Sequence, residues 1–135
     1  MEDFIIESSA ETPEVEFSKT RSVFRISGPS VADNADAFYN NVLVWIKNYA
    51  LDVNPNSHFD FQFSAISQAS LKSLLFLFQE IKAMELDGNA VSIAWYLSSS
   101  NCKMKEVGQD LGYMTDLSLD FIVSESKQVA ELEIS

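Results

Sequence analysis

Residues 58–72 read HFDFQFSAISQASLK, and this stretch decides the fold because its pattern changes half-way along. Its three phenylalanines alternate with polar residues, which is typical of a strand with one buried face. After Ser67 the apolar residues recur every three or four positions, which is typical of a helix. These helical positions are Leu71, Leu74, Leu75, Phe78 and Ile81. We therefore predict a strand that leads into a largely buried helix, beginning within two or three residues of Ser67.

Two serines, Ser67 and Ser70, lie at this change of pattern. The first turn of a helix has unpaired backbone N–H groups and the positive end of the helix dipole. A hydroxyl there can cap the helix, which is the commoner role, or carry a phosphate group. The residues alone leave both roles open.

Strand-like and helix-like segments alternate along the rest of the chain. The expected strands are 14–18, 23–27, 59–66, 90–97 and 117–121. The expected helices are 33–50, with Asp33 and Asp36 in a capping-box-like arrangement, about 67–86, and 103–111. This order predicts one α/β domain with a mixed sheet of about five strands and helices packed on it.

The two ends of the chain differ in composition from the middle. Residues 1–11 are polar and acidic, and we expect a flexible N-terminal segment because no packing pattern would hold them. Residues 12–123 carry the periodic patterns and form the predicted domain. Residues 124–135 are polar and acidic again, so we interpret them as a tail.

Composition excludes several classes of protein. The chain has 135 residues, 47% of them hydrophobic, which suits one domain with a substantial core. Its net charge of −11 argues against binding to nucleic acid or to an anionic membrane. The N-terminal residues have no positive n-region and the longest apolar run, 74–78, is too short to span a bilayer, so we expect a cytoplasmic protein.

Residues that carry chemistry are sparse. His58 is the only histidine, and no sequence signature places a serine or cysteine for activation by it, so we expect a structural role. Cys102 has no Cys or His at metal-ligand spacing, and we interpret it as a buried or half-buried small side chain. Trp45 and Trp95 lie in apolar patterns and are expected in the core. The sequence therefore predicts no enzyme activity, no metal site and no cofactor.

Several segments resemble those of a known family, in the same order and with similar gaps. Thr12-Pro13-Glu14-Val15 is similar to a Thr-Pro-Glu-Ile opening, and residues 91–96 are similar to a late strand that ends in Trp-Tyr. Residues 27–39 resemble a helix entrance of the form Gly-x-Ser-x-x-x-Asn-x-x-x-Phe-Tyr. These are features of the SiaC family of bacterial regulatory phosphoproteins. The motif residues matched here are Gly28, Ser30, Asn34, Tyr39, Trp45 and Trp95.

The resemblance implies a fold like that of the anti-sigma-factor antagonists, known as the STAS fold, and a role in partner switching. In the family, a hydroxyl residue at the strand-to-helix junction is phosphorylated by a dedicated kinase and dephosphorylated by a phosphatase. This modification controls docking to a client protein such as a diguanylate cyclase. The resemblance therefore implies a non-enzymatic regulator with a client, a kinase and a phosphatase as partners.

The family's junction reads Asn-Thr-Ser-Ser-x-Lys, and residues 67–72 of this chain align with it without a gap. Gln68 then stands where the family has its phosphoacceptor threonine. Ser70 keeps a family hydroxyl and is the first candidate for phosphorylation. Ser67, which replaces the asparagine, is the second candidate, because a capping role would tie its hydroxyl to the backbone; otherwise the switch is lost. The resemblance implies that Ser67, Gln68, Ser70 and Lys72 contact the client.

A second function remains open on the residues alone. Folds of this kind can hold an apolar ligand beside the sheet, so a small-ligand or lipid carrier is the alternative. The aromatic residues that could line such a pocket are Phe59, Phe61, Phe63, Phe76 and Phe78. The simpler interpretation of these side chains is an ordinary hydrophobic core.

Overall fold

The computed structural model describes residues 1–98 and 102–123, which form one mixed sheet with three helices. The strands are β1 (Phe4–Ile6), β2 (Glu14–Ser18), β3 (Val23–Ser30), β4 (Asn56–Ile66), β5 (Ala90–Leu97) and β6 (Asp120–Val123). The helices are α1 (Ala35–Tyr49), α2 (Gln68–Leu86) and α3 (Cys102–Thr115). The expected class, a single α/β domain with a mixed sheet, is confirmed, with six strands in place of about five.

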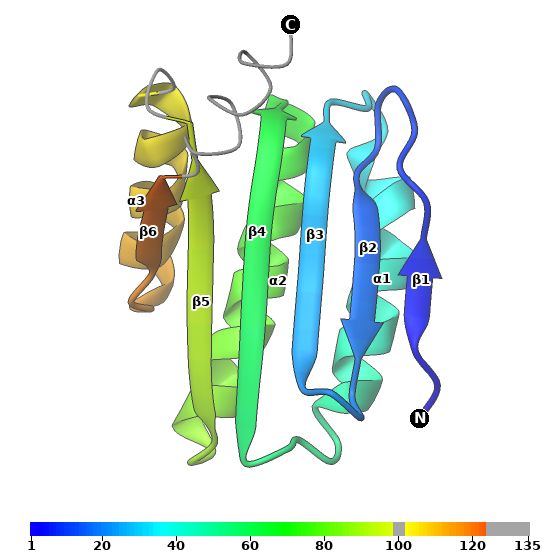
Figure 1. The fold of residues 1–135 in the computed structure, drawn as a ribbon, viewed down its shortest axis with the longest axis vertical. Helices are drawn as coiled ribbons and strands as arrows, with labels where there is room; N and C mark the ends of the chain where they lie inside the picture. Colours follow the sequence, from blue (N-terminus) through cyan, green and yellow to red (C-terminus); the bar gives the residue numbers. More distant parts are fainter. Residues whose placement is uncertain (99–101, 124–135) are drawn as a thin grey trace, which may run out of the picture.

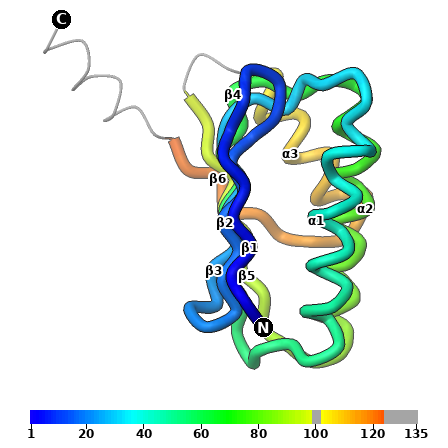
Figure 2. The backbone as a smooth tube through the Cα atoms, turned by 90° about the vertical axis from the view of Figure 1, so that its right-hand side faces the viewer, coloured from blue at the N-terminus to red at the C-terminus, as the bar shows by residue number. Residues whose placement is uncertain are grey.

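The strands lie side by side in chain order, from β1 to β6. β1, β2 and β3 pair antiparallel, whereas β3, β4, β5 and β6 pair parallel. Parallel neighbours need crossover connections, and the three helices supply them. All three helices cover the same face of the sheet, and the other face carries no helix from the described residues (Figures 1 and 2).

β1 is the strand that the sequence did not predict. The expectation that no packing pattern holds residues 1–11 is wrong for Phe4–Ile6, which pair with β2. The Phe4 ring lies 6.1 Å from the Phe17 ring and 6.2 Å from the Trp45 ring, measured between centroids. Three residues are too few to show a period in the sequence. The domain bounds 12–123 stay a prediction, and the predicted tail 124–135 lies outside the described residues.

Two groups of aromatic rings pack in the core between the sheet and the helices, among aliphatic side chains. The group where α1 meets the sheet comprises Phe17, Phe24, Trp45, Tyr49 and Phe59. The group where α2 and α3 meet the sheet comprises Phe61, Phe63, Phe78 and Trp95. Trp95 is 1% exposed and its Nε1 donates to the carbonyl oxygen of Met104 at 3.1 Å, which confirms its core placement.

Trp45 and Cys102 differ from their expected burial. Trp45 faces the sheet as expected but is only partly buried, because it lies at the margin of the core beside the short strand β1. Cys102 was expected to be buried or half-buried, and this is wrong, since its side chain is exposed. Cys102 is the first residue of α3, whose buried residues begin at Met104.

The three helices lie where the sequence pattern predicts them, and they differ from the prediction only in the residues at which they begin and end. α1 begins at Ala35 and not Asp33, and the side chain of its N-cap residue Asn34 makes no capping hydrogen bond. α2 buries Leu74 and Phe78 as predicted, whereas Leu71 and Leu75 are only half-buried because they face α3 at the edge of the helical layer. The last strand begins three residues later than predicted and spans Asp120–Val123.

Candidate functional site

The entrance of α2 lies where β4 ends, at the edge of the sheet to which the parallel strands point (Figure 1). Ser67 is the N-cap residue, with extended backbone, and its Oγ accepts a hydrogen bond from the backbone N of Ser70 at 3.2 Å. The backbone N of Ser67 donates to the carbonyl oxygen of Ser30 at 2.8 Å. Ser67 therefore takes the capping role and is tied to the end of β3, which fixes the direction in which α2 leaves the sheet.

A chain of buried hydroxyls runs beneath this entrance. Ser30 Oγ donates to Ser70 Oγ at 2.8 Å, and Ser70 Oγ donates to the carbonyl oxygen of Ser30, also at 2.8 Å. Because the Ser30 proton is used in this way, Tyr39 Oη donates to Ser30 Oγ across their 2.7 Å contact. Ser67 Oγ donates to Ser70 Oγ at 3.1 Å. Residues from β3, α1 and α2 are thus joined at one point.

Burial decides which of these hydroxyls can meet a partner. Ser70 is 0% exposed and Tyr39 is 1% exposed, and burial raises the pKa of the Tyr39 hydroxyl well above its ordinary value. Tyr39 therefore stays a hydrogen-bond donor throughout the physiological pH range. Ser70, which the sequence put forward for phosphorylation and client contact, is enclosed in the folded chain. Ser67 is half-buried and is the junction hydroxyl nearer to solvent.

The exposed part of the entrance is a hollow of about 480 Å³ between α1 and α2. Gln68 and Lys72, both predicted contact residues, lie in its lining and are exposed. The other lining residues are Asp36, Asn40, Leu43, Ala69, Ser73 and Phe76. Phe76 is 44% exposed, and Lys72 Nζ lies 6.0 Å from the centroid of its ring, a cation–π distance. An exposed aromatic ring beside a cation is a typical protein-contact surface.

A second hollow, of about 250 Å³, lies on the other side of α2, against α3. Lys72 lines both hollows, so it stands between them on the outer surface of α2. The remaining lining residues are Leu71, Leu75, Val107, Asp110, Leu111 and Met114. This surface was not predicted from the sequence, although apolar residues around more than half of the α2 circumference were a signal of it.

Comparison with known proteins decides the family. The model of the SiaC family, described as SiaC family regulatory phosphoprotein, matches residues 6–124. The chain belongs to the SiaC family. No curated protein matches the sequence.

Two solved structures are similar to the fold of this SiaC-family chain. Apo-SiaC from Pseudomonas aeruginosa has a TM-score of 0.80 and 19% identity, covering 91% of this chain and 98% of that one. The second is SiaC from the same organism as the activator in a complex with the diguanylate cyclase SiaD. It has a TM-score of 0.79 and 18% identity, covering 90% of this chain and 98% of that one. At identities of 18–19%, the similarity to these two structures shows a shared fold and nothing more.

Most SiaC-family motif residues gather along the path from β3 into α1. Gly28 has a φ of +111° where the register between β3 and β4 shifts, a backbone conformation that favours glycine. Ser30 and Tyr39 belong to the hydroxyl chain, and Asn34 is the N-cap residue of α1. Gln68, which the sequence resemblance aligns with the family's phosphoacceptor threonine, is the first residue of α2 and is exposed. The position is therefore open to solvent, but here it lacks a hydroxyl.

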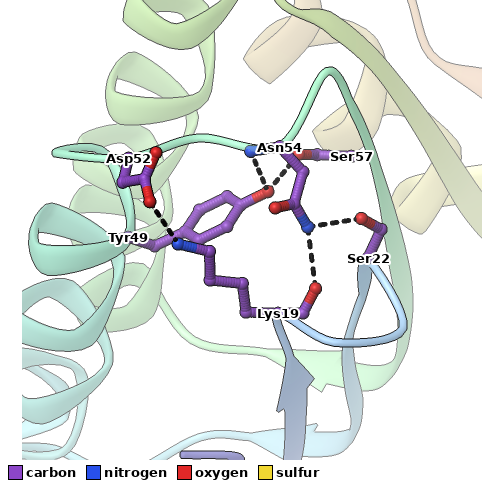
Figure 3. Close-up of polar contacts among 6 residues, drawn as sticks. All are labelled: Lys19, Ser22, Tyr49, Asp52, Asn54 and Ser57. Atoms are coloured by element: carbon purple, nitrogen blue, oxygen red, sulfur yellow. Dashed lines mark hydrogen bonds and ion pairs between the residues drawn. The ribbon is translucent and has the colours of Figure 1, made fainter. Parts of the chain in front are cut away.

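A separate polar cluster braces the opposite end of the sheet (Figure 3). Tyr49 Oη lies 2.6 Å from Ser57 Oγ and accepts from the backbone N of Asn54 at 3.1 Å. The Asn54 side chain donates to Ser22, whose φ of 55° is left-handed, and to the carbonyl oxygen of Lys19 at 2.7 Å. These bonds join the β2–β3 turn to the α1–β4 loop, which is a structural role.

His58 lies on the helix-free face and has a partner that the sequence did not reveal. Its Nδ1 is 2.7 Å from Ser92 Oγ on β5, and its Nε2 is 2.7 Å from Asp60 Oδ1. A serine is thus hydrogen-bonded to His58, although no sequence signature placed one there. Asp60 is 6% exposed, and Arg25 Nη2 lies 3.7 Å from its Oδ2. We interpret this group as the pairing of a buried carboxylate with two neighbours, because a buried charge needs partners.

Two kinds of site were not found in the part of the chain that the structure describes, a membrane-spanning helix and a metal-binding cluster. Within residues 1–98 and 102–123, no helix is long and apolar enough to cross a membrane. In the same residues, no group of three or more His, Cys, Asp and Glu side chains is placed to hold a metal ion.

Proposed function

We propose that this chain is a non-enzymatic, cytoplasmic regulator that binds a diguanylate cyclase through the entrance of α2. Family membership supports a regulatory role, and SiaC of Pseudomonas aeruginosa forms a complex with such an enzyme. The observation that carries the proposal is the exposed hollow of about 480 Å³ at this entrance, lined by Gln68, Lys72 and Phe76. An aromatic ring, a cation and an amide together provide apolar contact and directional hydrogen bonds to a protein surface.

We further propose that any phosphorylation by a dedicated kinase occurs at Ser67 and not at Ser70. Ser70 is fully buried and bonded to Ser30, so a kinase would have to unfold the entrance to reach it. Ser67 is half-buried at the start of α2, where the helix dipole favours a phosphate group. The added negative charge would repel an acidic client surface, and a phosphatase would restore docking.

The docking proposal is tested by mixing the purified chain with each diguanylate cyclase of its source bacterium. We expect one cyclase to bind in isothermal titration calorimetry and to change its rate of cyclic di-GMP synthesis. Lys72→Glu should weaken binding, whereas Lys47→Glu should not, because Lys47 is a similarly exposed lysine in the last turn of α1, at the opposite end of the helical layer. Equal weakening by both variants, or no binding by any cyclase, would contradict the proposal.

The ligand-carrier alternative gains no support from the aromatic side chains that suggested it. Phe59, Phe61, Phe63 and Phe78 are buried and lie against other rings of the core. Phe76 is exposed and lines the hollow between α1 and α2. The four buried rings therefore fill the space between the sheet and the helices, as a hydrophobic core does.

A further inference from the structure

The groove between α2 and α3, formed by the residues around the 250 Å³ hollow, is an apolar surface open to solvent. Leu71 and Leu75 of α2 face Val107 and Met114 of α3 across it. Leu71, Leu75 and Val107 are half-buried, and Met114 is 58% exposed. Exposed apolar side chains that share one groove mark an interaction surface more often than isolated ones do.

The basic side chains of residues 1–98 and 102–123 divide into those that form an ion pair and those that form none. Lys19, Arg21, Arg25 and Lys82 each form an ion pair with a carboxylate. Lys47, Lys72, Lys103 and Lys105 form none among the described residues, although the whole chain carries a net charge of −11. An unpaired lysine in such an acidic chain is a site of local attraction for an acidic group from outside.

Two of these unpaired lysines, Lys72 and Lys103, lie at the same end of the groove. Lys72 is part of its lining. Lys103 precedes Val107 by one helical turn, so it lies on the groove side of α3. α2 and α3 begin at the same end of the sheet (Figure 1), and Lys103 is the second residue of α3, so it belongs to that end of the helix. Lys105 follows Lys103 by two positions, about 200° around the helix, so it lies on the opposite side of α3.

We propose that the α2–α3 groove binds an acidic amphipathic helix of the client. Its apolar side chains would contact Leu75 and Met114, and its carboxylates would meet Lys72 and Lys103. Asp110 also lines the groove and repels the acidic segment, whose carboxylates are therefore concentrated at the lysine end. This inference rests on the proposed function, since Lys72 joins the groove to the hollow at the entrance. Regular i, i+4 spacing of apolar anchors is how helices occupy such grooves.

The test measures the affinity of the client cyclase for matched charge variants of the full chain by isothermal titration calorimetry. Lys103→Glu should weaken binding roughly fivefold, whereas Lys105→Glu, on the other side of the same helix, should stay within about twofold. Asp110→Lys should strengthen binding, a gain that structural damage would not produce. Met114→Glu should weaken it about tenfold, and because Met114 is exposed, circular dichroism should show an unchanged fold.

Each other outcome overturns the inference in a distinguishable way. Parent-like binding by every variant would place the client elsewhere and leave the proposed function standing. Tighter binding of Lys103→Glu with weaker binding of Asp110→Lys would mean a basic partner segment. Dimers of the chain that Met114→Glu dissolves, seen by sedimentation, would mean that a second copy occupies the groove. Binding of no cyclase at all would remove both this inference and the proposed function.

Discussion

At the scale of single residues, the junction at the entrance of α2 separates a structural serine from an accessible one. Ser70 Oγ takes part in hydrogen bonds with both Ser30 and Ser67 and has no access to solvent. Ser67 caps the helix and is half-buried. Gln68, which the sequence resemblance aligns with the family's phosphoacceptor threonine, is exposed but has no hydroxyl to carry a phosphate. The resemblance located the junction, whereas burial distinguishes the roles of its residues.

Replacing Ser70 should therefore reduce stability before it affects regulation. Ser70→Ala leaves the buried Ser30 hydroxyl without its acceptor, which typically costs about 1–3 kcal/mol of unfolding free energy. Ser70→Asp should cost more, because a carboxylate would be buried there. Urea denaturation measures both losses, with the exposed neighbour Ala69→Ser as the control. Parent-like stability of Ser70→Asp would show that the site is open.

Phosphorylation is predicted at Ser67 if the switch operates in this chain. Phosphopeptide mass spectrometry on protein from the source bacterium should find phosphate on Ser67 and none on Ser70. Ser67→Asp should then weaken binding to the client cyclase. Ser67→Ala should bind the cyclase whether or not the kinase is active. If cells contain no phosphate at Ser67 and both variants bind like the parent, the switch has been lost and the chain is a constitutive partner.

At the scale of elements, α3 packs closely on the sheet because Gly108 has no side chain. A Cβ at Gly108 would lie 2.8 Å from the Trp95 ring and 2.9 Å from the Phe121 ring. These distances are shorter than a van der Waals contact between carbon atoms, so any larger residue at this position must displace α3 or the Trp95 ring. The position of α3, and with it the second wall of the α2–α3 groove, depends on this glycine.

Gly108→Ala should accordingly destabilise the domain, in spite of the higher helix propensity of alanine. Overpacking a closely packed site typically costs about 1–3 kcal/mol, which outweighs the roughly 1 kcal/mol that alanine gains over glycine within a helix. Thermal unfolding of the variant checks this, with the exposed α3 substitution Gln109→Ala as the control. A higher melting temperature for Gly108→Ala would contradict the close packing.

Replacing each of the two tryptophans with alanine should lower the free energy of unfolding by a different amount. Trp95→Ala removes a fully buried ring, and such changes typically cost about 3–5 kcal/mol, a large part of the stability of a domain this size. Trp45→Ala should cost less, because that ring is only partly buried beside β1. Chemical denaturation of both variants gives the comparison. Equal losses, or an unchanged midpoint for Trp95→Ala, would be inconsistent with the packing described here.

Long periodic segments could be predicted from the sequence, and short or surface features could not. The change of period at Ser67 located β4 and α2, because a half-buried strand and a buried helix each leave a repeating apolar pattern. β1 has three residues and no period, so only its contacts with Phe17 and Trp45 reveal it. The burial of Ser70 depends on Ser30, forty positions away, and no local pattern encodes that contact.

At the scale of the whole molecule, structure and charge both distinguish the two faces of the sheet. One face carries the three helices and both hollows of α2, whereas the other carries polar side chains such as the paired group of His58 and Asp60. Most basic side chains away from the α2 entrance are already paired with carboxylates. Apolar surface therefore coincides with two lysines that are unpaired within the described residues, Lys72 and Lys103, on the helical face near the entrance of α2.

The most direct test of client docking at this entrance is hydrogen–deuterium exchange of the chain with and without its cyclase. Bound cyclase should slow exchange in peptides that cover 67–76 and 103–114, and leave peptides at the end of α1, around Lys47, unchanged. Slowed exchange confined to the helix-free face, in peptides that cover 56–62 and 90–94, would contradict the account.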